Sequence, residues 1–548
     1  MPTTARMFGV IGTLWNAIFR PRYPAGTAPT TLDEHDREVQ LIAAKVKEFH
    51  ERGEPFRIFH GSTNSTRKSA LGRDPKKVVD TSRLNHVVRV DVEKQVALVE
   101  PNVAMDRLVE ATLEHGLVPP VVMEFPGITV GGGYNGTSGE SSSFKHGFFD
   151  RTINWVEMVL ADGRVVVASE KDHSDLFRGG AGAVGTFGVT TLVELQLHKA
   201  TKFVETTYHP VGNVKEAITL TKDFTSRPDE FDYVDGILYS PFAGAVITGR
   251  MVDEPTAGMP IQRFSAPYDP WFYLHVKECM AIHPKEEALT VASKQHTELI
   301  PLTDYLFRYD RGGFWVGRST FLYFIFVPFN WFTRWFLDDF LHTRMLYQAL
   351  HGSGNSDYFM VQDLALPWDT AQTFIEKMEQ GVDIWPLWLC PLKGGSRKSM
   401  HPHLQQHDQE EGMLNIGLWG ACAERYLYKG GIIDANRDVE SALRELGGMK
   451  WLYAKVYSTE SDFWSQFDKE WYDKLRKKYN AEGLPNVFDK VAGGEKHKAN
   501  QTSITGADWP FAGIRGIRQA IRSGDYLQAR NPAWNYWVPR DNSSPLKA

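Results

Sequence analysis

Helical patterns of apolar residues appear twice in the first part of the chain. In "TLDEHDREVQLIAAKVKEFHERG" the residues Val39, Ile42, Val46 and Phe49 recur at helical spacing, and Gly53 stands where the helix would end. The later segment "AMDRLVEATLEHG" also has the pattern of a helix, closed by its final glycine. Each stretch therefore predicts a helix.

Two further stretches predict β-hairpins. The segment "HVVRVDVEKQVALVEP" alternates between apolar and polar residues, turns, and alternates again. The segment "INWVEMVLADGRVVVAS" contains the turn pair Asp162 and Gly163 between two β-rich runs. Strands and helices mixed in this order predict an α+β domain that ends near residue 200.

A glycine-rich stretch lies between the second helix and the second hairpin. It is "FPGITVGGGYNGTSGESSSFKHGFFDR", residues 125–151. Its glycines allow the backbone to approach a ligand closely, and its serines and threonines supply uncharged hydrogen-bond donors. A loop of this kind can neutralise a diphosphate with amide dipoles, which explains why few basic residues lie near it. A second loop of small hydroxyl residues, "RIFHGSTNSTR", also suits an anion. The alternative is a glycine-rich turn without a ligand.

Composition limits the classes of function. The chain has 548 residues, 42% of them hydrophobic, which favours two domains over one. With 61 basic and 67 acidic residues the net charge is -6, so a nucleic-acid partner is not expected. The three cysteines, Cys279, Cys390 and Cys422, have no paired spacing, so we predict neither a disulfide framework nor a structural zinc site, in a reduced intracellular setting.

Two motif matches are rejected. Residues 180–185 read GAGAVG, a GxGxxG match, but neither the preceding strand nor the following helix of a dinucleotide-binding fold is expected there. The segment "HPHLQQHDQEEG", residues 401–412, carries metal-capable side chains at irregular spacing, and we interpret it as a solvated loop. No metal ligand is predicted.

Two apolar runs bear on membrane contact. Residues 7–19, "MFGVIGTLWNAIF", are too few to span a bilayer, and they suit either an interfacial segment or a helix docked on the protein itself. Residues 319–341, "STFLYFIFVPFNWFTRWFLDDFL", suit either buried core or a surface that touches lipid or lines the mouth of a pocket for an apolar ligand.

Four motifs together resemble a known family. The segments "HGSTNST", "PGITVGGGYNGTSGESSSFKHG", "VEMVLADG" and "SDLFRGGAGAVGTFGVTT" are similar, in order and spacing, to the FAD-binding domain of the PCMH-type (vanillyl-alcohol-oxidase) flavoproteins. Within that superfamily the chain most resembles the Δ24-sterol reductase (24-dehydrocholesterol reductase, Diminuto) group. The likeness continues through "YDPWFYLHVKE", "IPLTDYLFRYDRGGFW", "DIWPLWLCP" and "WLYAKVYSTESDFWSQFDKEWYDKLRKKY".

The resemblance implies a two-domain α+β fold. We expect an N-terminal apolar segment over residues 1–29, a PCMH-type FAD-binding domain over 30–203, an α/β substrate cap over 204–470 and a C-terminal helical extension over 471–548. The cap would enclose the substrate above the isoalloxazine ring. The end of the extension, from residue 508, has no counterpart in the family, and we expect it to fold and pack on the cap.

The resemblance also implies the FAD-binding residues. They are Gly61, Ser62, Thr63, Asn64 and Ser65 in the first loop; Thr129, Val130, Gly131, Gly132, Gly133, Tyr134, Asn135, Gly136, Thr137, Ser138, Gly139, Glu140 and Ser141 in the second; and Gly188 and Val189 at the adenine end. Covalent members of the superfamily use a histidine within the first loop. Here His60 stands in front of that loop, so non-covalent FAD is expected.

By this likeness the protein would reduce the C24–C25 double bond of a sterol or triterpenoid side chain with electrons from NADPH. Proton addition at C24 and flavin hydride at C25 require a positioned acid and an apolar pocket. The acid candidates in the most specific cap motif are Tyr453, Tyr457 and Glu460. The aromatic residues expected to wall the pocket are Trp385, Trp388, Trp451, Tyr453 and Tyr457.

Two other functions stay open. An FAD oxidase or dehydrogenase of the same superfamily would act on an alcohol or other small molecule with oxygen as acceptor, and a non-catalytic sterol-binding protein would need no flavin. Animal members of the group begin with a membrane-spanning segment, which this sequence lacks. We therefore expect peripheral membrane contact at the endoplasmic reticulum through residues 7–19 or 321–341. The oligomeric state is not indicated.

Overall fold

The computed structural model describes residues 30–60, 77–255, 258–281, 294–324, 327–353, 359–395, 398–403, 412–426, 428, 430–492 and 511–524. The apolar segment 7–19 and the expected phosphate loop Gly61–Ser65 lie outside the described residues, as do residues 404–411 of the histidine-rich segment. Within the described ranges, no helix has both the length and the apolar composition to cross a bilayer.

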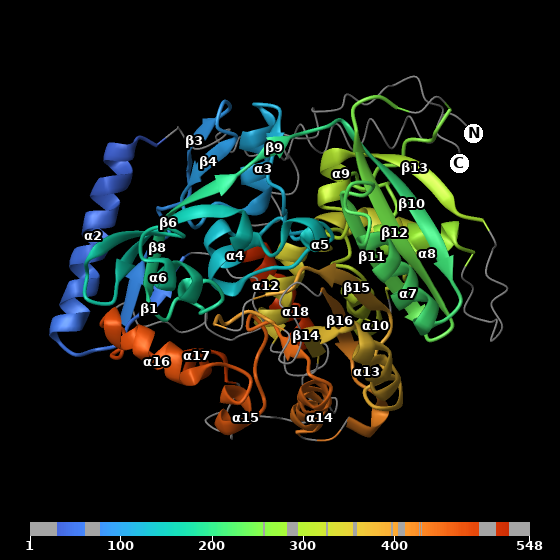
Figure 1. The fold of residues 1–548 in the computed structure, drawn as a ribbon. Helices are drawn as coiled ribbons and strands as arrows, with labels where there is room; N and C mark the ends of the chain where they lie inside the picture. The colour runs from blue at the N-terminus through green and yellow to red at the C-terminus, as the bar shows by residue number, and fades with distance from the viewer. Residues whose placement is uncertain are drawn as a thin grey trace.

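The first part of the chain forms a mixed α/β unit around an antiparallel sheet (Figure 1). The five-stranded sheet runs β3-β4-β8-β6-β7, with β3 Val87–Asp91, β4 Val96–Val99, β8 Gly188–Gln196, β6 Ile153–Leu160 and β7 Val165–Ser169. Two small sheets accompany it: β1 Arg57–Phe59 with β2 Val78–Asp80, and β5 Leu117–Val118 with β9 His198–Lys199. Helices α2 Leu32–Glu51, α3 Met105–Leu113, α4 Val130–Gly136, α5 Ser143–His146 and α6 Ser174–Gly180 complete the unit.

The helices and hairpins predicted from the sequence pattern are confirmed. Helix α2 begins after Thr31, which forms a reciprocal capping box with Glu34, and its expected apolar face is buried. Gly53 follows it with φ +62°. Strands β6 and β7 pair antiparallel around the predicted turn, where Gly163 has φ +87°. The GAGAVG stretch follows helix α6 and precedes strand β8, the reverse of the order that a dinucleotide-binding motif requires.

A large antiparallel sheet forms the core of the second part of the chain. Its order is β13-β10-β12-β11-β15-β16-β14-β17, with β13 His296–Pro301, β10 Phe203–Val211, β12 Ala243–Val252, β11 Tyr233–Ser240, β15 Leu387–Leu392, β16 Met413–Ala421, β14 Phe359–Pro367 and β17 Met449–Lys450. Helices α7 Val214–Thr225, α13 Trp368–Gln380 and α14 Gly431–Glu445 contact the sheet on one side. The two sheets with their helices establish the expected two-domain α+β fold.

Period-two alternation gives the large sheet two different faces. In β14, Met360, Leu364 and Leu366 belong to the apolar cluster that includes residues of α7, α13 and α14. The intervening Val361 and Asp363 belong to the lining of the cavity on the opposite side. The same alternation in β15 and β16 directs Trp388, Asn415 and Trp419 toward that cavity. One face of the sheet is therefore structural and the other faces the site.

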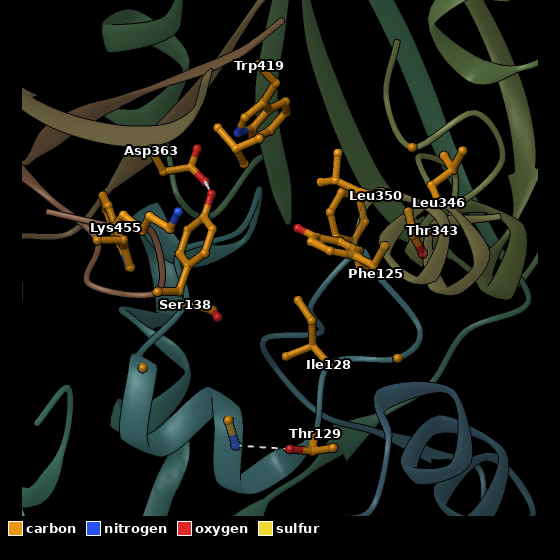
Figure 2. A pocket seen from close by; sticks show the side chains of 18 of the residues that line it. Phe125, Ile128, Thr129, Ser138, Thr343, Leu346, Leu350, Asp363, Trp419 and Lys455 are labelled. Carbon is orange, nitrogen blue, oxygen red and sulfur yellow. Dashed lines mark hydrogen bonds between the residues drawn. The ribbon is translucent and has the colours of Figure 1, made fainter. Parts of the chain in front are cut away.

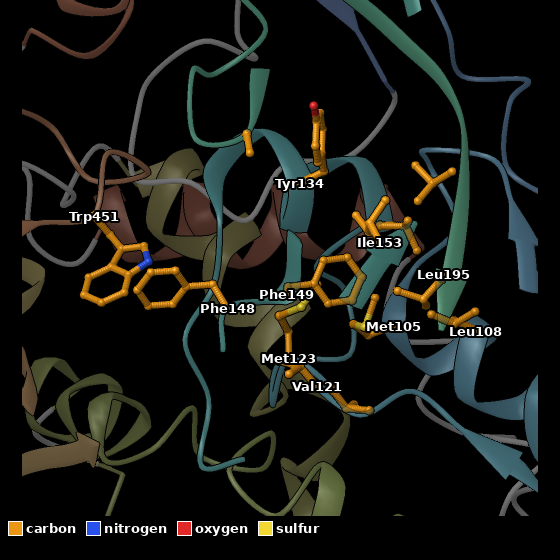
Figure 3. Close-up of a cluster of buried hydrophobic side chains, with 14 of the residues drawn as sticks. Met105, Leu108, Val121, Met123, Tyr134, Phe148, Phe149, Ile153, Leu195 and Trp451 are labelled. Atoms are coloured by element: carbon orange, nitrogen blue, oxygen red, sulfur yellow. The ribbon is translucent and has the colours of Figure 1, made fainter. Parts of the chain in front are cut away.

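A continuous apolar core joins the two parts of the chain (Figure 3). Phe149 lies in this core beneath α4, next to Met123. Phe148 meets Trp451 of the second part edge-to-face, with ring centroids 5.8 Å apart. The contact brings the segment after β17 against the glycine-rich segment.

The helices after residue 459 are divided between the two parts of the molecule. These are α15 Glu460–Trp464, α16 Lys469–Lys478, α17 Val487–Val491 and α18 Phe511–Ser523. Helices α16 and α17 lie beside the N-terminal unit (Figure 1), where the Tyr472 hydroxyl donates to Thr186 Oγ1 at 2.9 Å. Helix α18 instead packs on α12 Thr343–Ser353, which is consistent with the expected packing of the tail on the cap.

Candidate functional site

A large cavity of about 770 Å³ lies between the glycine-rich segment and the inner face of the large sheet. Residues of both parts of the chain line it, as Figure 2 shows for Ile128 and Thr129 on one side and Asp363 and Trp419 on the other. Its volume is within the range of protein sites for small molecules and cofactors.

The glycine-rich segment is a short helix at this wall and not the loop that its composition suggested. Thr129 caps helix α4, and its Oγ1 accepts a hydrogen bond from the Gly132 backbone N–H at 3.1 Å (Figure 2). The helix forms despite its glycines, and neighbouring residues pack closely against it. A Cβ at Gly131 would lie 2.7 Å from Pro101 Cβ, and one at Gly133 would lie 2.5 Å from Phe149 Cδ1.

The glycines therefore have two different roles. Gly131 and Gly133 permit close packing inside the protein, as their contacts with Pro101 and Phe149 require. Gly136 has no atom within 4 Å of the position that a Cβ would take, and it lines the cavity. At Gly136 the absent side chain leaves room for a ligand.

The structure divides the expected FAD residues into two groups. Those that line the cavity are Thr129, Gly131, Gly132, Asn135, Gly136, Thr137, Ser138, Gly139, Glu140 and Val189. Those outside its lining are Val130, Gly133, Tyr134, Ser141 and Gly188. Tyr134 is buried in the core, where its hydroxyl donates to the Phe177 carbonyl at 2.8 Å. Gly188 is needed for sheet packing, because a Cβ there would lie 2.2 Å from Val159 O.

Three cationic side chains lie at the cavity, and sequence reasoning assigned none of them to the cofactor. Arg57, Lys455 and Lys490 line the cavity, although only Arg57 is close in sequence to an expected phosphate loop. Lys490 Nζ donates to Val184 O at 3.1 Å and to Gly185 O at 2.8 Å. The local shortage of basic residues is thus offset by residues from distant segments. His60 also lines the cavity, in front of the expected phosphate loop.

Unpartnered polar atoms at the cavity fit the requirements of FAD. Buried atoms without a hydrogen-bond partner include Asn135 Oδ1, Glu124 Oε2, Asn415 Oδ1 and Trp451 Nε1, all on residues of its lining. Buried polar groups are normally paired, so these atoms indicate a bound molecule with complementary groups. Together with the open space at Gly136, they form a site that an extended, hydrogen-bonding cofactor can fill.

Of the three proposed acids, the structure brings Tyr453 to the cavity. Its hydroxyl donates to Asp363 Oδ2 at 2.5 Å, and Asn415 Nδ2 donates to the other carboxylate oxygen at 3.0 Å. Glu460 is exposed at the start of α15, and Tyr457 lies outside the lining. A proton donor must reach its substrate, so a position outside the cavity argues against Tyr457 and Glu460 as the acid.

Burial changes the acidity of this pair. It raises the pKa of the Tyr453 hydroxyl well above 10, and the neighbouring Asp363 carboxylate adds to the rise. Burial also raises the pKa of Asp363 to about 6, while hydrogen bonds from Tyr453 and Asn415 oppose the change. At neutral pH, Asp363 is therefore mainly ionised and Tyr453 is a weak acid.

A buried charge cluster adjoins the cavity and was not expected from the sequence. Arg308 Nη2 donates to Glu124 Oε1 at 3.0 Å and to Asp235 Oδ2 at 2.9 Å. Burial raises the pKa of Glu124 to about 8, an effect that Arg308 opposes and Asp235 reinforces. Burial also raises the pKa of Glu140 well above its usual range. One guanidinium thus faces several buried carboxyl groups, and some of them keep their protons at neutral pH.

One sequence signal could have pointed to this cluster. Glu124 is the single charged residue in the apolar run "LVPPVVMEFPG", where a carboxyl group has no reason to be buried unless it is paired or functional. Its partner Arg308 follows 184 positions later, a separation that local patterns do not bridge.

Aromatic side chains form the far wall of the cavity. The ring centroids of Phe314 and Trp419 lie 4.3 Å apart, and those of Phe314 and Trp388 lie 5.3 Å apart. Trp388, Trp451 and Tyr453 line the cavity as expected, whereas Trp385 and Tyr457 do not. The result is an apolar chamber next to the ionisable groups.

The aromatic run 319–341 combines both of its expected roles. In helix α10, Val316–Tyr323, the side of Ser319, Thr320 and Tyr323 lines the cavity, and Phe321 is buried. Helix α11, Trp331–Phe336, has no buried residue. Its large exposed side chains are Trp331, Phe332 and Phe336, with exposed fractions of 57%, 53% and 69%.

Comparisons with known proteins agree with this architecture. Residues 37–169 match the family described as FAD binding domain. The chain is 28% identical over 478 residues to the human Delta(24)-sterol reductase, covering 84% of this chain and 87% of that protein. It is 28% identical over 509 residues to the Pisum sativum Delta(24)-sterol reductase, covering 85% and 86%. A Caenorhabditis elegans Delta(24)-sterol reductase homolog is 26% identical over 510 residues, covering 87% and 91%. These matches confirm the expected resemblance: the protein is an FAD-dependent oxidoreductase that is similar, over most of its length, to the Delta(24)-sterol reductases.

Proposed function

We propose that this protein reduces the C24–C25 double bond of a sterol or triterpenoid side chain, with bound FAD and electrons from NADPH. The observation that carries the proposal is the continuity of one cavity from the FAD-binding segment to an aromatic chamber with proton-bearing carboxyl groups. Such a chamber suits an alkene that no neighbouring carbonyl activates, because that substrate needs both an acid and exclusion of water.

Residues along the glycine-rich helix would hold the cofactor. Thr129, Gly132, Asn135 and Gly136 line the cavity along this helix, and Lys455 and Lys490 add positive charge to its lining. When bound, FAD supplies hydride-transfer chemistry at its isoalloxazine ring. The attachment is proposed to be non-covalent.

Glu124 is the proton donor that we propose for C24. At pH 7 its carboxyl group is mainly protonated, because its pKa is about 8. Its Oε1 is held by Arg308, and its Oε2 has no hydrogen-bond partner among the described residues. Tyr453 is a poorer donor, since its pKa is raised and its hydroxyl already donates to Asp363.

Positive charge that develops at C25 would be stabilised by aromatic and carboxylate side chains of the cavity. Trp388 and Trp419 offer electron-rich ring faces to a cation. Asp363 supplies a carboxylate that is mainly ionised above about pH 6. Two carboxyl groups with separated pKa values can thus act as acid and as electrostatic stabiliser in one site.

Exposed apolar residues near the chamber support entry of the substrate from a membrane. Helix α18 lines the cavity at Gly513 and Ile517, and its exposed side chains include Phe511, Ile514 and Ile521. Arg515, Arg518 and Arg522 are also exposed along it. A helix with an apolar stripe and flanking arginines suits a bilayer surface with anionic lipid. We therefore propose peripheral membrane contact through α11 and α18, at the endoplasmic reticulum.

The first experiment follows the flavin absorbance of the purified protein under anaerobic conditions. Addition of NADPH is expected to bleach the flavin, and desmosterol, a Δ24-unsaturated sterol, is expected to restore it. Bleaching without recovery would exclude this alkene as the electron acceptor. A flavin that NADPH leaves oxidised, together with oxygen consumption on an alcohol substrate, would favour the oxidase alternative.

The rate of flavin reoxidation by the sterol should depend on pH in a bell shape. It rises through about pH 6 as Asp363 ionises and falls through about pH 8 as Glu124 loses its proton.

Glu124→Gln, which is isosteric, should slow reoxidation by about 10²–10⁴-fold and leave reduction by NADPH unchanged. Stopped-flow absorbance separates the two steps.

Tyr453→Phe serves as the comparison for Glu124→Gln. It should retain most of the reoxidation rate, because the proposed donor remains. Loss of the rate in Tyr453→Phe, with Glu124→Gln active, would assign the proton to Tyr453 and contradict the present assignment.

Two glycine substitutions distinguish a glycine that leaves room for FAD from a glycine that permits close packing in the core. Gly136→Ala adds a methyl group in the open cavity and should weaken FAD binding by about tenfold without lowering the melting temperature of the apoprotein. Gly133→Ala forces contact with Phe149 and should destabilise the fold by about 1–3 kcal/mol. Flavin titration and thermal unfolding of the apoprotein measure the two effects.

Acid precipitation should release the flavin, and retention on the protein would contradict non-covalent attachment.

Membrane contact is tested by sedimentation with vesicles of phosphatidylcholine and phosphatidylserine. The double variant Trp331→Asp, Phe336→Asp should lower binding by about tenfold or more, because two exposed aromatic side chains can no longer enter the bilayer. Leu41→Asp is the control, since Leu41 is 63% exposed on α2 of the other unit. Undiminished binding of the double variant, with loss on deletion of residues 1–29, would assign the contact to the N-terminal segment.

A further inference from the structure

Helix α8, Phe272–Cys279, and strand β13 meet at one edge of the large sheet and bring together residues of zinc-binding type. His275 and Cys279 are four positions apart on the helix, so their side chains lie on the same face. His296 and Glu298 are two positions apart on the strand, so their side chains also share a face. The four side chains converge although 16 residues separate Cys279 from His296 in the chain, counting 280–295.

The distances between ligand atoms suit a tetrahedral metal ion. The potential ligand atoms of His275, Cys279 and His296 all lie within 4.8 Å of one another. Cys279 Sγ lies 3.4 Å from His275 Nε2, and Glu298 Oε2 lies 3.1 Å from His275 Nε2 and 3.2 Å from His296 Nε2. Bonds of about 2.0–2.3 Å to zinc place tetrahedral ligand atoms about 3.3–3.7 Å apart, close to the observed spacing.

The surroundings support the same ligand set. The Tyr208 hydroxyl donates to Glu298 Oε1 at 2.6 Å and so helps to orient the carboxylate, whose Oε1 lies 3.0 Å from His275 Nε2 and whose Oε2 lies within reach of both imidazoles. Tyr208 also stacks on the His296 ring, with an interplanar angle of 2°. Groups that orient a metal ligand in this way are typical of metal sites. Glu298 is buried, whereas the His296 side chain is 38% exposed and leaves a path for an ion.

We propose that His275, Cys279, His296 and Glu298 bind one structural Zn²⁺ ion that fastens α8 to the edge strand β13. A thiolate, a carboxylate and two neutral imidazoles balance the charge of the ion, and this mixture of ligands favours zinc over calcium or magnesium. Cysteine spacing and the histidine-rich segment 401–412 had led us to predict no metal ligand, because these four residues come from a helix and a strand that local spacing does not connect. The ligands lie outside the lining of the FAD and substrate cavity, so the site is independent of the proposed reductase activity.

The metal content of the full-length protein tests the proposal directly. Protein prepared without a histidine tag, with zinc in the growth medium, should contain about one zinc ion per chain by inductively coupled plasma mass spectrometry. Cys279→Ser and His296→Ala should each lose most of the zinc. Cys422→Ser is the matched control and should retain it, because Cys422 belongs to no such group among the described residues.

Two measurements on the wild-type protein test the zinc site without relying on variants, which can lose zinc simply because they fail to fold. Removal of zinc with a chelator should lower the melting temperature, and added zinc should restore it at a constant FAD concentration. Cobalt in place of zinc should give d–d absorption at longer wavelengths than the flavin bands, with the intensity typical of tetrahedral coordination. Zinc-free wild-type protein that takes up neither metal would overturn the proposal, as would zinc that persists in Cys279→Ser.

Discussion

The buried guanidinium of Arg308 links the two parts of the molecule. It donates to Glu124, which precedes the glycine-rich helix, and to Asp235 on strand β11 of the large sheet. The ring of Tyr305 lies 4.1 Å from its guanidinium carbon and completes the enclosure. Removing one member of such a buried group typically costs about 3–5 kcal/mol, because the remaining charge has no partner. This contact therefore ties the segment before the glycine-rich helix to the large sheet.

Burial has the largest effect on the protonation of this cluster. It raises the pKa of Glu124 above that of an exposed carboxyl group, Arg308 opposes the rise, and the carboxylate of Asp235 adds to it. Asp363, on the inner face of the same sheet, receives hydrogen bonds from Tyr453 and Asn415 and ionises at a lower pH. Burial and the separated pKa values of the two carboxyl groups are therefore linked.

Side chains alternate along the strands of the large sheet, so one face of the sheet packs against helices and the other faces the cavity. Side chains on one face pack under α7, α13 and α14, and those on the other face form the chamber. Helices α10, α12 and α18 border the chamber where exposed apolar residues begin. The edge strand β13 lies at the opposite end of the sheet from β14 and β17, so the proposed zinc site lies far along the sheet from Asp363 on β14, which lines the cavity.

The sequence by itself determined the local elements and the cofactor domain. Apolar periodicity was sufficient for α2 and the two hairpins, because capping at Thr31 and the turn at Gly163 depend on neighbouring residues alone. The glycine-rich segment was recognised through its resemblance to a family, although its helical form depends on packing against Pro101 and Phe149. Only the tertiary structure decided which carboxyl groups meet at the cavity, the cationic side chain of Lys490 there and the cluster around His275. Each of these joins residues far apart in the chain, and their proximity results from strand order and helix docking, which local sequence patterns do not specify.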